Sequence, residues 1–163
     1  MSEIELGGYM TNLLRVDLAE EKVIKETLDN AILRKFIGGT GIGIKILYDE
    51  VPSGVEWYNQ ENRLILASGP LGGTRIGGSG GFSVVTKGPL TNGATSVQSN
   101  GFFGAYLKFC GYDGIIIQGS SNKWVYIYVD DDVVELRDAS HIIGMGTYET
   151  EDTIKRELGK KAG

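Results

Sequence analysis

The alternation of hydrophobic and polar residues predicts a chain rich in β-strands. Apolar residues at every second position, or in short continuous runs, are typical of strands that are half or fully buried in a sheet. Segments of this kind recur at residues 10–18, 22–26, 63–68, 82–86, 94–98, 114–118, 124–129 and 133–136. Short polar turns at 19–21 and 130–132 join neighbouring segments, which predicts two hairpins.

Helical periodicity is confined to a few shorter segments. These segments are residues 31–37, 42–49, 102–109 and 147–158. Asp29 or Asn30 is a candidate cap for the first helix, and Thr147 or Thr150 for the last. Because the helices are few and unevenly spaced, the pattern favours an α+β fold over a regular alternation of strands and helices.

Composition and charge narrow the classes of protein. With 41% hydrophobic and 23% charged residues, the 163-residue chain is globular, and we expect residues 1–163 to form one domain. No apolar run approaches the length of a transmembrane helix, and residues 1–9 lack the features of a secretory signal. The net charge of −5 and the scattered basic residues exclude nucleic-acid binding. With a single cysteine, the chain is expected to be cytoplasmic and without membrane contact.

Glycine is the unusual feature of the composition. The chain has 25 glycines, seven of them between residues 69 and 81. Neither a dinucleotide fingerprint nor a Walker loop is present, although residues 39–43 come near the first. The two glycine pairs within residues 77–81 have two interpretations that the sequence leaves open. They permit close approach of a flat or anionic ligand to the backbone, or they permit a tight crossing of two strands.

Side chains suited to catalysis are scarce. His141, the single histidine, follows a serine directly, and adjacent side chains do not form a triad, so a structural role is favoured. Cys110 lies on an apolar helical face and is interpreted as a core residue. The acidic run at residues 130–132 is interpreted as a solvated turn, although on paper it resembles a cation site. We therefore expect this chain alone to be inactive as an enzyme.

An ordered set of motifs carries a resemblance to a known family. The motifs are Leu66–Thr74 (LASGPLGGT), Val84–Thr91 (VVTKGPLT), Gly101–Ala105 (GFFGA), Leu107–Phe109, Gly111–Asp113 and Arg137–His141 (RDASH). In this order and spacing they resemble the N-terminal domain of the aldehyde ferredoxin oxidoreductase family, the tungsten–pterin enzymes. The similarity extends from about Tyr9 to Leu158. It implies a β-rich domain of two mixed sheets with a few short helices, which forms a platform beneath two pterins.

The resemblance also implies an activity and its cofactors. It implies the N-terminal portion of an oxidoreductase that carries tungsten-bis(molybdopterin), oxidises aldehydes to carboxylic acids and passes electrons to ferredoxin. A [4Fe–4S] cluster needs four thiolates, so it would be held by downstream domains absent from this chain. The implied partners are those C-terminal domains or a separate subunit, ferredoxin, and a possible second copy of the chain. A cloned fragment, a truncated gene and one piece of a split enzyme are each consistent with the short length.

Specific positions follow from the resemblance. The implied cofactor-binding residues are Arg75, Gly80, Gly81, Gln98, Ser99, Asn100 and Gly101. Gln98 would offer its backbone carbonyl to a magnesium ion that bridges the pterin phosphates. Gly81 stands where the family has a phosphate-binding arginine, and Arg75 is expected to replace that guanidinium. Asn100 stands where the family has glycine.

Three other functions remain open at this point. A cofactor-free scaffold or interaction domain is consistent with glycine at position 81 and with the missing downstream domains. The platform of a benzoyl-CoA-reductase-type tungsten subunit, from a second branch of the same family, fits the same motifs. An unrelated phosphate- or nucleotide-binding enzyme that uses the glycine-rich loop is the third.

Overall fold

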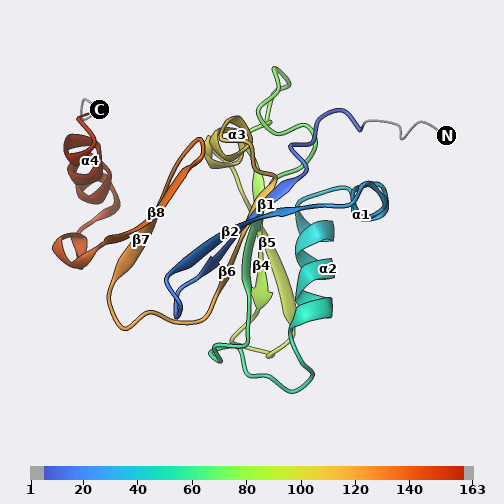
Figure 1. Cartoon of the computed structure of the whole chain (residues 1–163), viewed down its shortest axis with the longest axis horizontal. Helices are drawn as coiled ribbons and strands as arrows, with labels where there is room; N and C mark the ends of the chain where they lie inside the picture. Colours follow the sequence, from blue (N-terminus) through green and yellow to red (C-terminus); the bar gives the residue numbers. More distant parts are fainter. Residues whose placement is uncertain (1–5, 160–163) are drawn as a thin grey trace.

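A mixed sheet of six strands forms the centre of the computed structural model, which describes residues 6–159 (Figure 1). In spatial order its strands are β2 (Lys22–Thr27), β1 (Asn12–Asp17), β6 (Gly114–Gln118), β3 (Leu64–Ala67), β4 (Phe82–Lys87) and β5 (Ala94–Ser99). Strands β1 and β6 are parallel, and the other neighbouring strands are antiparallel. A hairpin of β7 (Val125–Asp130) and β8 (Val133–Asp138) lies to one side as a separate two-stranded sheet.

Within residues 6–159, four α-helices lie at about the positions that the periodicity predicts; the first three lie between strands and the fourth follows the last strand. They are α1 (Asn30–Phe36), α2 (Thr40–Glu50), α3 (Phe103–Phe109) and α4 (Thr147–Glu157), with a 3-10 turn at Ser140–Ile142. Asp29 caps α1, because its carboxylate accepts a hydrogen bond from the amide of Ala31 at 2.9 Å. Gly146 precedes α4 as its cap, so the prediction of Thr147 or Thr150 is wrong.

The predicted α+β class is confirmed, and the predicted pair of mixed sheets is only half right. The six-stranded sheet is mixed because the chain crosses over between β1 and β6. The second sheet is a plain antiparallel hairpin, because one short turn at residues 130–132 joins its two strands. The second sheet is therefore antiparallel and not mixed, as the resemblance had implied, and its two strands are the hairpin that the pattern predicts.

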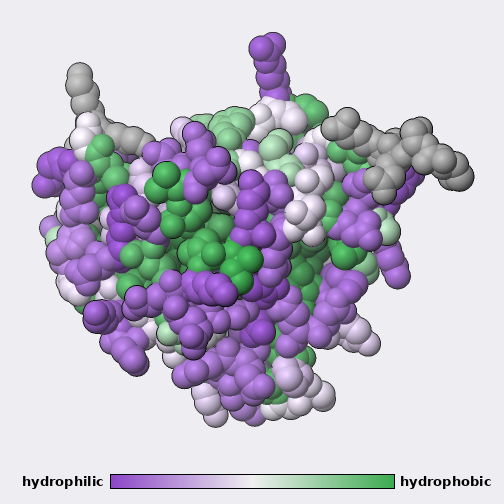
Figure 2. All heavy atoms as spheres, in the orientation of Figure 1, coloured by the Kyte–Doolittle hydropathy of each residue, from purple (hydrophilic) through white to green (hydrophobic). Residues whose placement is uncertain are grey.

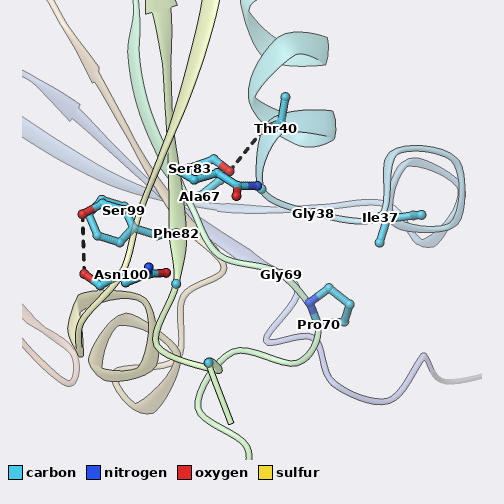
Figure 3. Close-up of a pocket in the computed structure, with 14 residues that line it drawn as sticks. Ile37, Gly38, Thr40, Ala67, Gly69, Pro70, Phe82, Ser83, Ser99 and Asn100 are labelled. Atoms are coloured by element: carbon cyan, nitrogen blue, oxygen red, sulfur yellow. Dashed lines mark hydrogen bonds between the residues drawn. The ribbon is translucent and has the colours of Figure 1, made fainter. Parts of the chain in front are cut away.

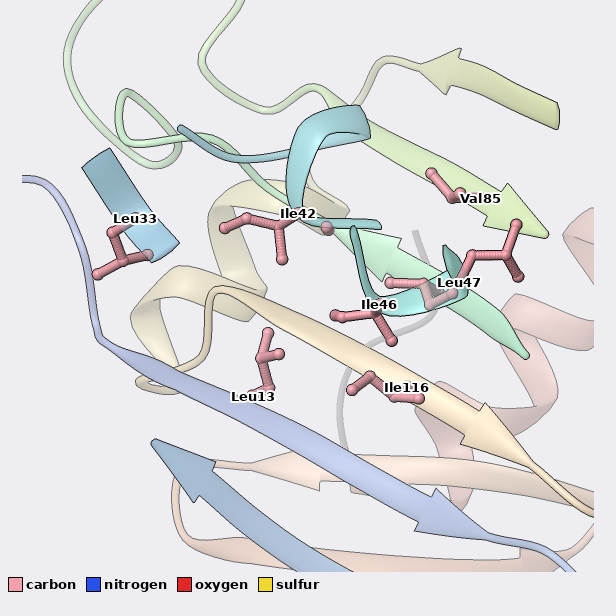
Figure 4. Packing of buried hydrophobic residues seen from close by; sticks show 9 residues of the cluster. Leu13, Leu33, Ile42, Ile46, Leu47, Val85 and Ile116 are labelled. Atoms are coloured by element: carbon pink, nitrogen blue, oxygen red, sulfur yellow. The ribbon is translucent and has the colours of Figure 1, made fainter. Parts of the chain in front are cut away.

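One face of the sheet is packed against α1 and α2 (Figure 4). The buried side chains of this first cluster are Leu13, Leu33, Ile42, Ile46, Leu47, Ile65, Ala67, Val85 and Ile116. Gly43 lets α2 lie directly on β4, since a Cβ at Gly43 would stand 2.6 Å from a methyl carbon of Val85. This close packing fixes the N-terminal end of α2 next to the ends of β3, β4 and β5.

The opposite face of the sheet is covered less completely. A second buried cluster consists of Leu14, Val16, Leu107, Tyr112 and Ile115. The hairpin β7–β8 contributes only partly buried side chains to it, and Cys110 packs beside them. Cys110, interpreted from the sequence as a core residue, is thus only partly buried at the edge of this cluster. Helix α4 contains no buried residue at all.

A buried ion pair fastens the N-terminal segment to the sheet. Lys108 and Asp113 form this pair, and both side chains are almost fully buried. The carboxylate of Asp113 also accepts hydrogen bonds from the amides of Met10, at 3.0 Å, and Thr11, at 2.7 Å. The Lys108 ammonium donates to the carbonyl of Gly8 at 2.7 Å. Each charge is therefore compensated by more than one partner, as burial requires.

A second group of charges lies at the other end of the sheet. The guanidinium of Arg15 contacts Glu26 at 2.5 Å and Glu50 at 2.6 Å, and Arg63 contacts Glu50 at 3.0 Å. Burial alone would raise the pKa of Glu50, but the hydrogen bonds from the two arginines outweigh it and lower that pKa. These contacts tie α2 to β1 and to the start of β3.

Candidate functional site

An open hollow of about 440 Å³ lies where α2 begins, beside β4 and β5 (Figure 3). Its lining residues come from four separate stretches of the chain, within residues 37–40, 67–70, 78–83 and 98–100. They are Ile37, Gly38, Gly39, Thr40, Ala67, Gly69, Pro70, Gly78, Gly81, Phe82, Ser83, Gln98, Ser99 and Asn100. We call this site the glycine hollow. It brings together four of the implied cofactor-binding residues: Gly81, Gln98, Ser99 and Asn100.

Bare backbone forms much of the wall of the glycine hollow. A Cβ built at Gly69 or at Gly78 would meet no atom within 4 Å, so both positions border open space. At Gly81 the nearest atoms would be 3.6 Å away, which is ordinary contact. Gly78 has a φ of +84°, a conformation that favours glycine. Side chains at these positions would occupy the hollow, and their absence leaves main-chain groups accessible.

Hydroxyl and amide groups supply the polar part of the wall. The hydroxyl of Thr40 lies 3.1 Å from that of Ser83 and 2.7 Å from that of Ser96 (Figure 3 shows the first pair). Gly39, the cap residue of α2, donates its amide to the carbonyl of Ser68 at 2.9 Å. Among the described residues, 6–159, no charged side chain lines the hollow. The wall of the hollow is therefore polar but uncharged, and α2 begins beside it.

Two adjacent glycines of the implied set have different environments. A Cβ at Gly80 would stand 1.7 Å from the carbonyl oxygen of Gly101, so Gly80 is required by a close backbone crossing. The amide of Gly104 donates to the carbonyl of Gly80 at 3.2 Å, which holds this crossing. Gly80 and Gly101 line a different hollow of about 430 Å³, beside α3. The close-crossing interpretation therefore applies at Gly80, whereas Gly81 borders the glycine hollow, where close approach of a ligand stays a prediction.

Arg75 lines neither hollow, although its neighbour Thr74 lines the second. The side chain of Arg75 is exposed in the loop between β3 and β4. Sequence reasoning also missed Thr40 and Ser83. The signal for Thr40 was the Gly38–Gly39 pair directly before a helix, which places backbone amides at a helix start. Ser83 gave no comparable signal, because it reads as an ordinary strand residue.

The remaining candidate side chains have structural partners. The ring of His141 pairs through Nε2 with Glu157 at 2.6 Å, which links the 3-10 turn to α4. Asp130 accepts a hydrogen bond from the hydroxyl of Tyr128 at 2.9 Å. Within residues 6–159 no group of three or more His, Cys, Asp or Glu side chains is arranged to hold a metal ion. In the same part of the chain, no helix has both the length and the apolar character to span a bilayer.

Comparisons with known proteins show similarity to one enzyme family. The family model described as "Aldehyde ferredoxin oxidoreductase, N-terminal domain" matches residues 13–163. The chain is 43% identical, over 154 residues, to the tungsten-containing aldehyde ferredoxin oxidoreductase of Pyrococcus furiosus. It is 39% identical to the aliphatic sulfonate oxidoreductase, WOR-like subunit, of the same organism. These alignments cover 94% and 93% of the chain, but only 26% and 24% of the two relatives.

A solved structure has the same fold over nearly the whole chain. It is the active-site complex BamBC of benzoyl coenzyme A reductase with 1,5-dienoyl-CoA, which matches with a TM-score of 0.91 at 39% identity. The match covers 94% of this chain and 24% of the other. This chain therefore spans about a quarter of the length of the relatives that it matches. Because the family match extends from Leu13 to Gly163, the chain belongs to the aldehyde ferredoxin oxidoreductase family, in which it corresponds to the N-terminal domain.

Proposed function

We propose that this chain is the cofactor platform of a tungsten-containing oxidoreductase and that the glycine hollow receives the phosphate end of a pterin cofactor. The observation that carries the proposal is the accessible backbone at Gly69, Gly78 and Gly81, in a domain whose curated relatives are named as tungsten-containing enzymes. The hollow has room for a phosphate group and offers neutral donors. It also lacks carboxylates that would repel an anion.

Each lining residue has a defined part in this proposal. Gln98 would offer its backbone carbonyl to a magnesium ion, and Ser99 and Asn100 would border the phosphate end of the cofactor. Ser83, whose hydroxyl accepts from Thr40, would donate its own hydroxyl from the opposite wall. When bound, the tungsten centre would supply the two-electron chemistry that no side chain of this domain can provide. The domain itself would bind and orient the cofactor.

The reaction of the complete enzyme depends on parts outside this chain. Oxidation of an aldehyde to a carboxylic acid, with electrons passed through a [4Fe–4S] cluster to ferredoxin, is the proposal that the names of the curated relatives favour. Reduction of benzoyl-CoA is the alternative, favoured by the TM-score of 0.91 with the benzoyl-CoA reductase structure. The cluster would be bound by the rest of the enzyme, since a [4Fe–4S] cluster needs four thiolates and this chain has one cysteine.

A titration of the isolated chain tests the hollow directly. Magnesium and inorganic pyrophosphate serve as the probe, and backbone amide signals are followed by NMR. We expect signals of Gly78, Gly81 and Gln98–Asn100 to shift, because these residues line the hollow. Gly81→Arg should bind the probe about tenfold more tightly, because it adds the charge-assisted donor that the hollow lacks.

A matched control variant distinguishes binding in the glycine hollow from non-specific attraction of an anion to any added arginine. Gly77→Arg adds the same charge at an exposed position outside the hollow, where a Cβ has open space. It should leave the affinity unchanged. If millimolar pyrophosphate shifts no signal of the lining residues, or if both arginine variants strengthen binding equally, the hollow is not a phosphate site.

A cofactor-free interaction domain is the second candidate function. The observation that favours it is the uncharged lining of the glycine hollow within the described residues. This candidate predicts a folded domain that binds neither pyrophosphate nor pterin. The same titration therefore decides between the two functions.

A further inference from the structure

Helix α3 exposes a row of aromatic side chains. Phe102, Phe103, Tyr106 and Phe109 have exposed fractions of 75%, 41%, 63% and 63%. The Phe102 and Tyr106 rings lie 6.2 Å apart, and the Tyr106 and Phe109 rings lie 6.1 Å apart, so these three rings form a continuous row. The Phe103 ring packs against Phe82 and borders the groove described next. We call these four residues the aromatic face of α3. The other side of the same helix is buried against the sheet, so packing within the domain does not account for the aromatic face.

An apolar groove continues the aromatic face toward the hairpin. The groove has a volume of about 310 Å³ and lies between α3, β6 and β7. It is lined by Leu66, Phe103, Tyr106, Leu107, Cys110, Ile115, Ile117, Ile127 and Val129. Figure 2 shows the hydrophobic surface that gathers here, between the hairpin and the central sheet. None of these lining residues is charged, so a partner that fits the groove presents apolar side chains.

The hairpin and the helix nearest the C-terminus are also incompletely packed in the described residues, 6–159. A two-stranded hairpin by itself is marginally stable, and β7–β8 leaves every one of its side chains at least partly exposed. The outermost helix, α4, buries no residue. Contiguous apolar surface of this kind marks a site of contact with another protein surface. By contrast, the face of the sheet under α2 has nine fully enclosed core residues.

We propose that the aromatic face of α3 and the adjoining groove are the docking surface for the remainder of the family enzyme, the part that lies outside this chain. The size of the relatives supports this occupant, because the chain covers only 24–26% of them. The structural match, with a TM-score of 0.91, shows that this fold persists inside a much longer chain. The surface would be buried in the complete enzyme, whether the remainder follows in the same polypeptide or is a separate subunit.

This inference rests on the family and not on the cofactor. Docking of the remainder needs the apolar groove beside α3, whereas cofactor binding needs the glycine hollow, and the two share no lining residue. An enzyme that assembles without tungsten would contradict the proposed function and support the docking surface. The two claims can therefore fail separately.

Side-chain footprinting provides the test. This chain is joined to the three quarters of the Pyrococcus furiosus tungsten-containing aldehyde ferredoxin oxidoreductase that it does not cover; we call this the joined enzyme. Hydroxyl radicals label exposed Phe and Tyr side chains, and mass spectrometry reads the label at each residue, normalised to an added tyrosine peptide. We expect labelling of Tyr106 and Phe109 to fall at least tenfold from the isolated chain to the joined enzyme. Unchanged labelling of both residues would overturn the proposal.

A second arm does not depend on folding of the joined enzyme. The chain with Tyr106→Glu and Phe109→Glu is co-expressed with the remainder as a separate polypeptide, and co-purification is measured. Because both side chains are exposed, the melting temperature of the isolated variant should stay within about 2 °C, while recovery of the remainder falls at least tenfold. Tyr48→Glu, at an exposed position of α2, is the matched control and should retain the remainder.

The competing occupant is a second copy of this chain. Sedimentation of the isolated chain over a hundredfold range of concentration reports it. We expect a monomer whose Tyr106 labelling is independent of concentration. A dimer in which Tyr106 becomes protected, or full recovery of the remainder by the double glutamate variant, would overturn the proposal.

Discussion

The two faces of the central sheet differ in how completely they are covered. On the face beneath α2, nine side chains from strands and helices are enclosed, and Gly43 brings the helix into direct contact with β4. On the opposite face the hairpin β7–β8 supplies only partly buried residues, and an apolar groove remains open beside α3. The hydrophobic core on the first face is complete within this chain. The second face resembles a protein–protein interface, because its apolar groove stays exposed in this chain.

The largest expected effect concerns the buried ion pair of Lys108 and Asp113. Lys108→Met leaves the Asp113 carboxylate buried without its cation, and we expect a loss of about 3–5 kcal/mol in the free energy of unfolding. Chemical denaturation measures this change. Lys155→Met, on α4, removes an exposed pair with Glu151 and should leave the denaturation midpoint unchanged. Equal losses in the two variants would contradict the distinction between a fastened sheet and a loosely attached α4.

The next effect compares matched isoleucines on the two sides. Ile116 is fully enclosed in the first cluster, so Ile116→Ala should cost about 2–5 kcal/mol of unfolding free energy. Ile127 of the hairpin is only partly buried in the isolated chain, and Ile127→Ala should cost less than half as much. A cost at Ile127 that equals the cost at Ile116 would show that the hairpin is fully packed without a partner.

A smaller effect separates the two adjacent glycines. Gly80→Ala places a methyl group against the carbonyl oxygen of Gly101 and should cost about 1–3 kcal/mol. Gly81→Ala adds the same group where the nearest atoms are at ordinary contact distance, and the cost should stay within about 0.5 kcal/mol. Thermal unfolding of both variants decides whether only one of the pair is structural.

The smallest expected effect is a pH dependence of the free energy of unfolding, caused by Glu50. The pKa of Glu50 is lowered, because the hydrogen bonds from Arg15 and Arg63 outweigh its burial. A lowered native pKa means that this stabilisation is present above the ordinary value of about 4.5 and is lost as the pH falls through the native pKa. Glu50→Gln should therefore cost about 1 kcal/mol at neutral pH, and progressively less below about pH 4.5. A cost that does not change between pH 7 and pH 3 would contradict the shift.

Local patterns were sufficient to predict most elements of this fold. Alternation and short apolar runs placed the strands, and Asp29 marked the start of α1. Pairing between distant strands was beyond such patterns, because the parallel contact of β1 with β6 depends on the crossover between them. The hairpin β7–β8 was predicted by the pattern, and only the mixed character that the resemblance implied for its sheet was wrong. A hairpin signal is local, whereas additional strands would have to come from distant parts of a chain.

The candidate site was only partly visible in the sequence. Gly81, Gln98, Ser99 and Asn100 were implied by resemblance, and the structure brings them to one hollow. The opposite wall was missed, because Thr40 and Ser83 become neighbours only when α2 packs on β4. Gly80 was grouped with Gly81, since two consecutive glycines look alike until their separate contacts are known.

The cofactor content of the joined enzyme tests the central claim most directly. The joined enzyme is expressed without oxygen in medium with tungstate, and tungsten is measured by mass spectrometry and pterin by fluorescence after oxidation. The account predicts about one tungsten atom per chain, with pterin present, in the enzyme that carries this platform. A folded joined enzyme that contains neither tungsten nor molybdenum and shows no pterin fluorescence would contradict it.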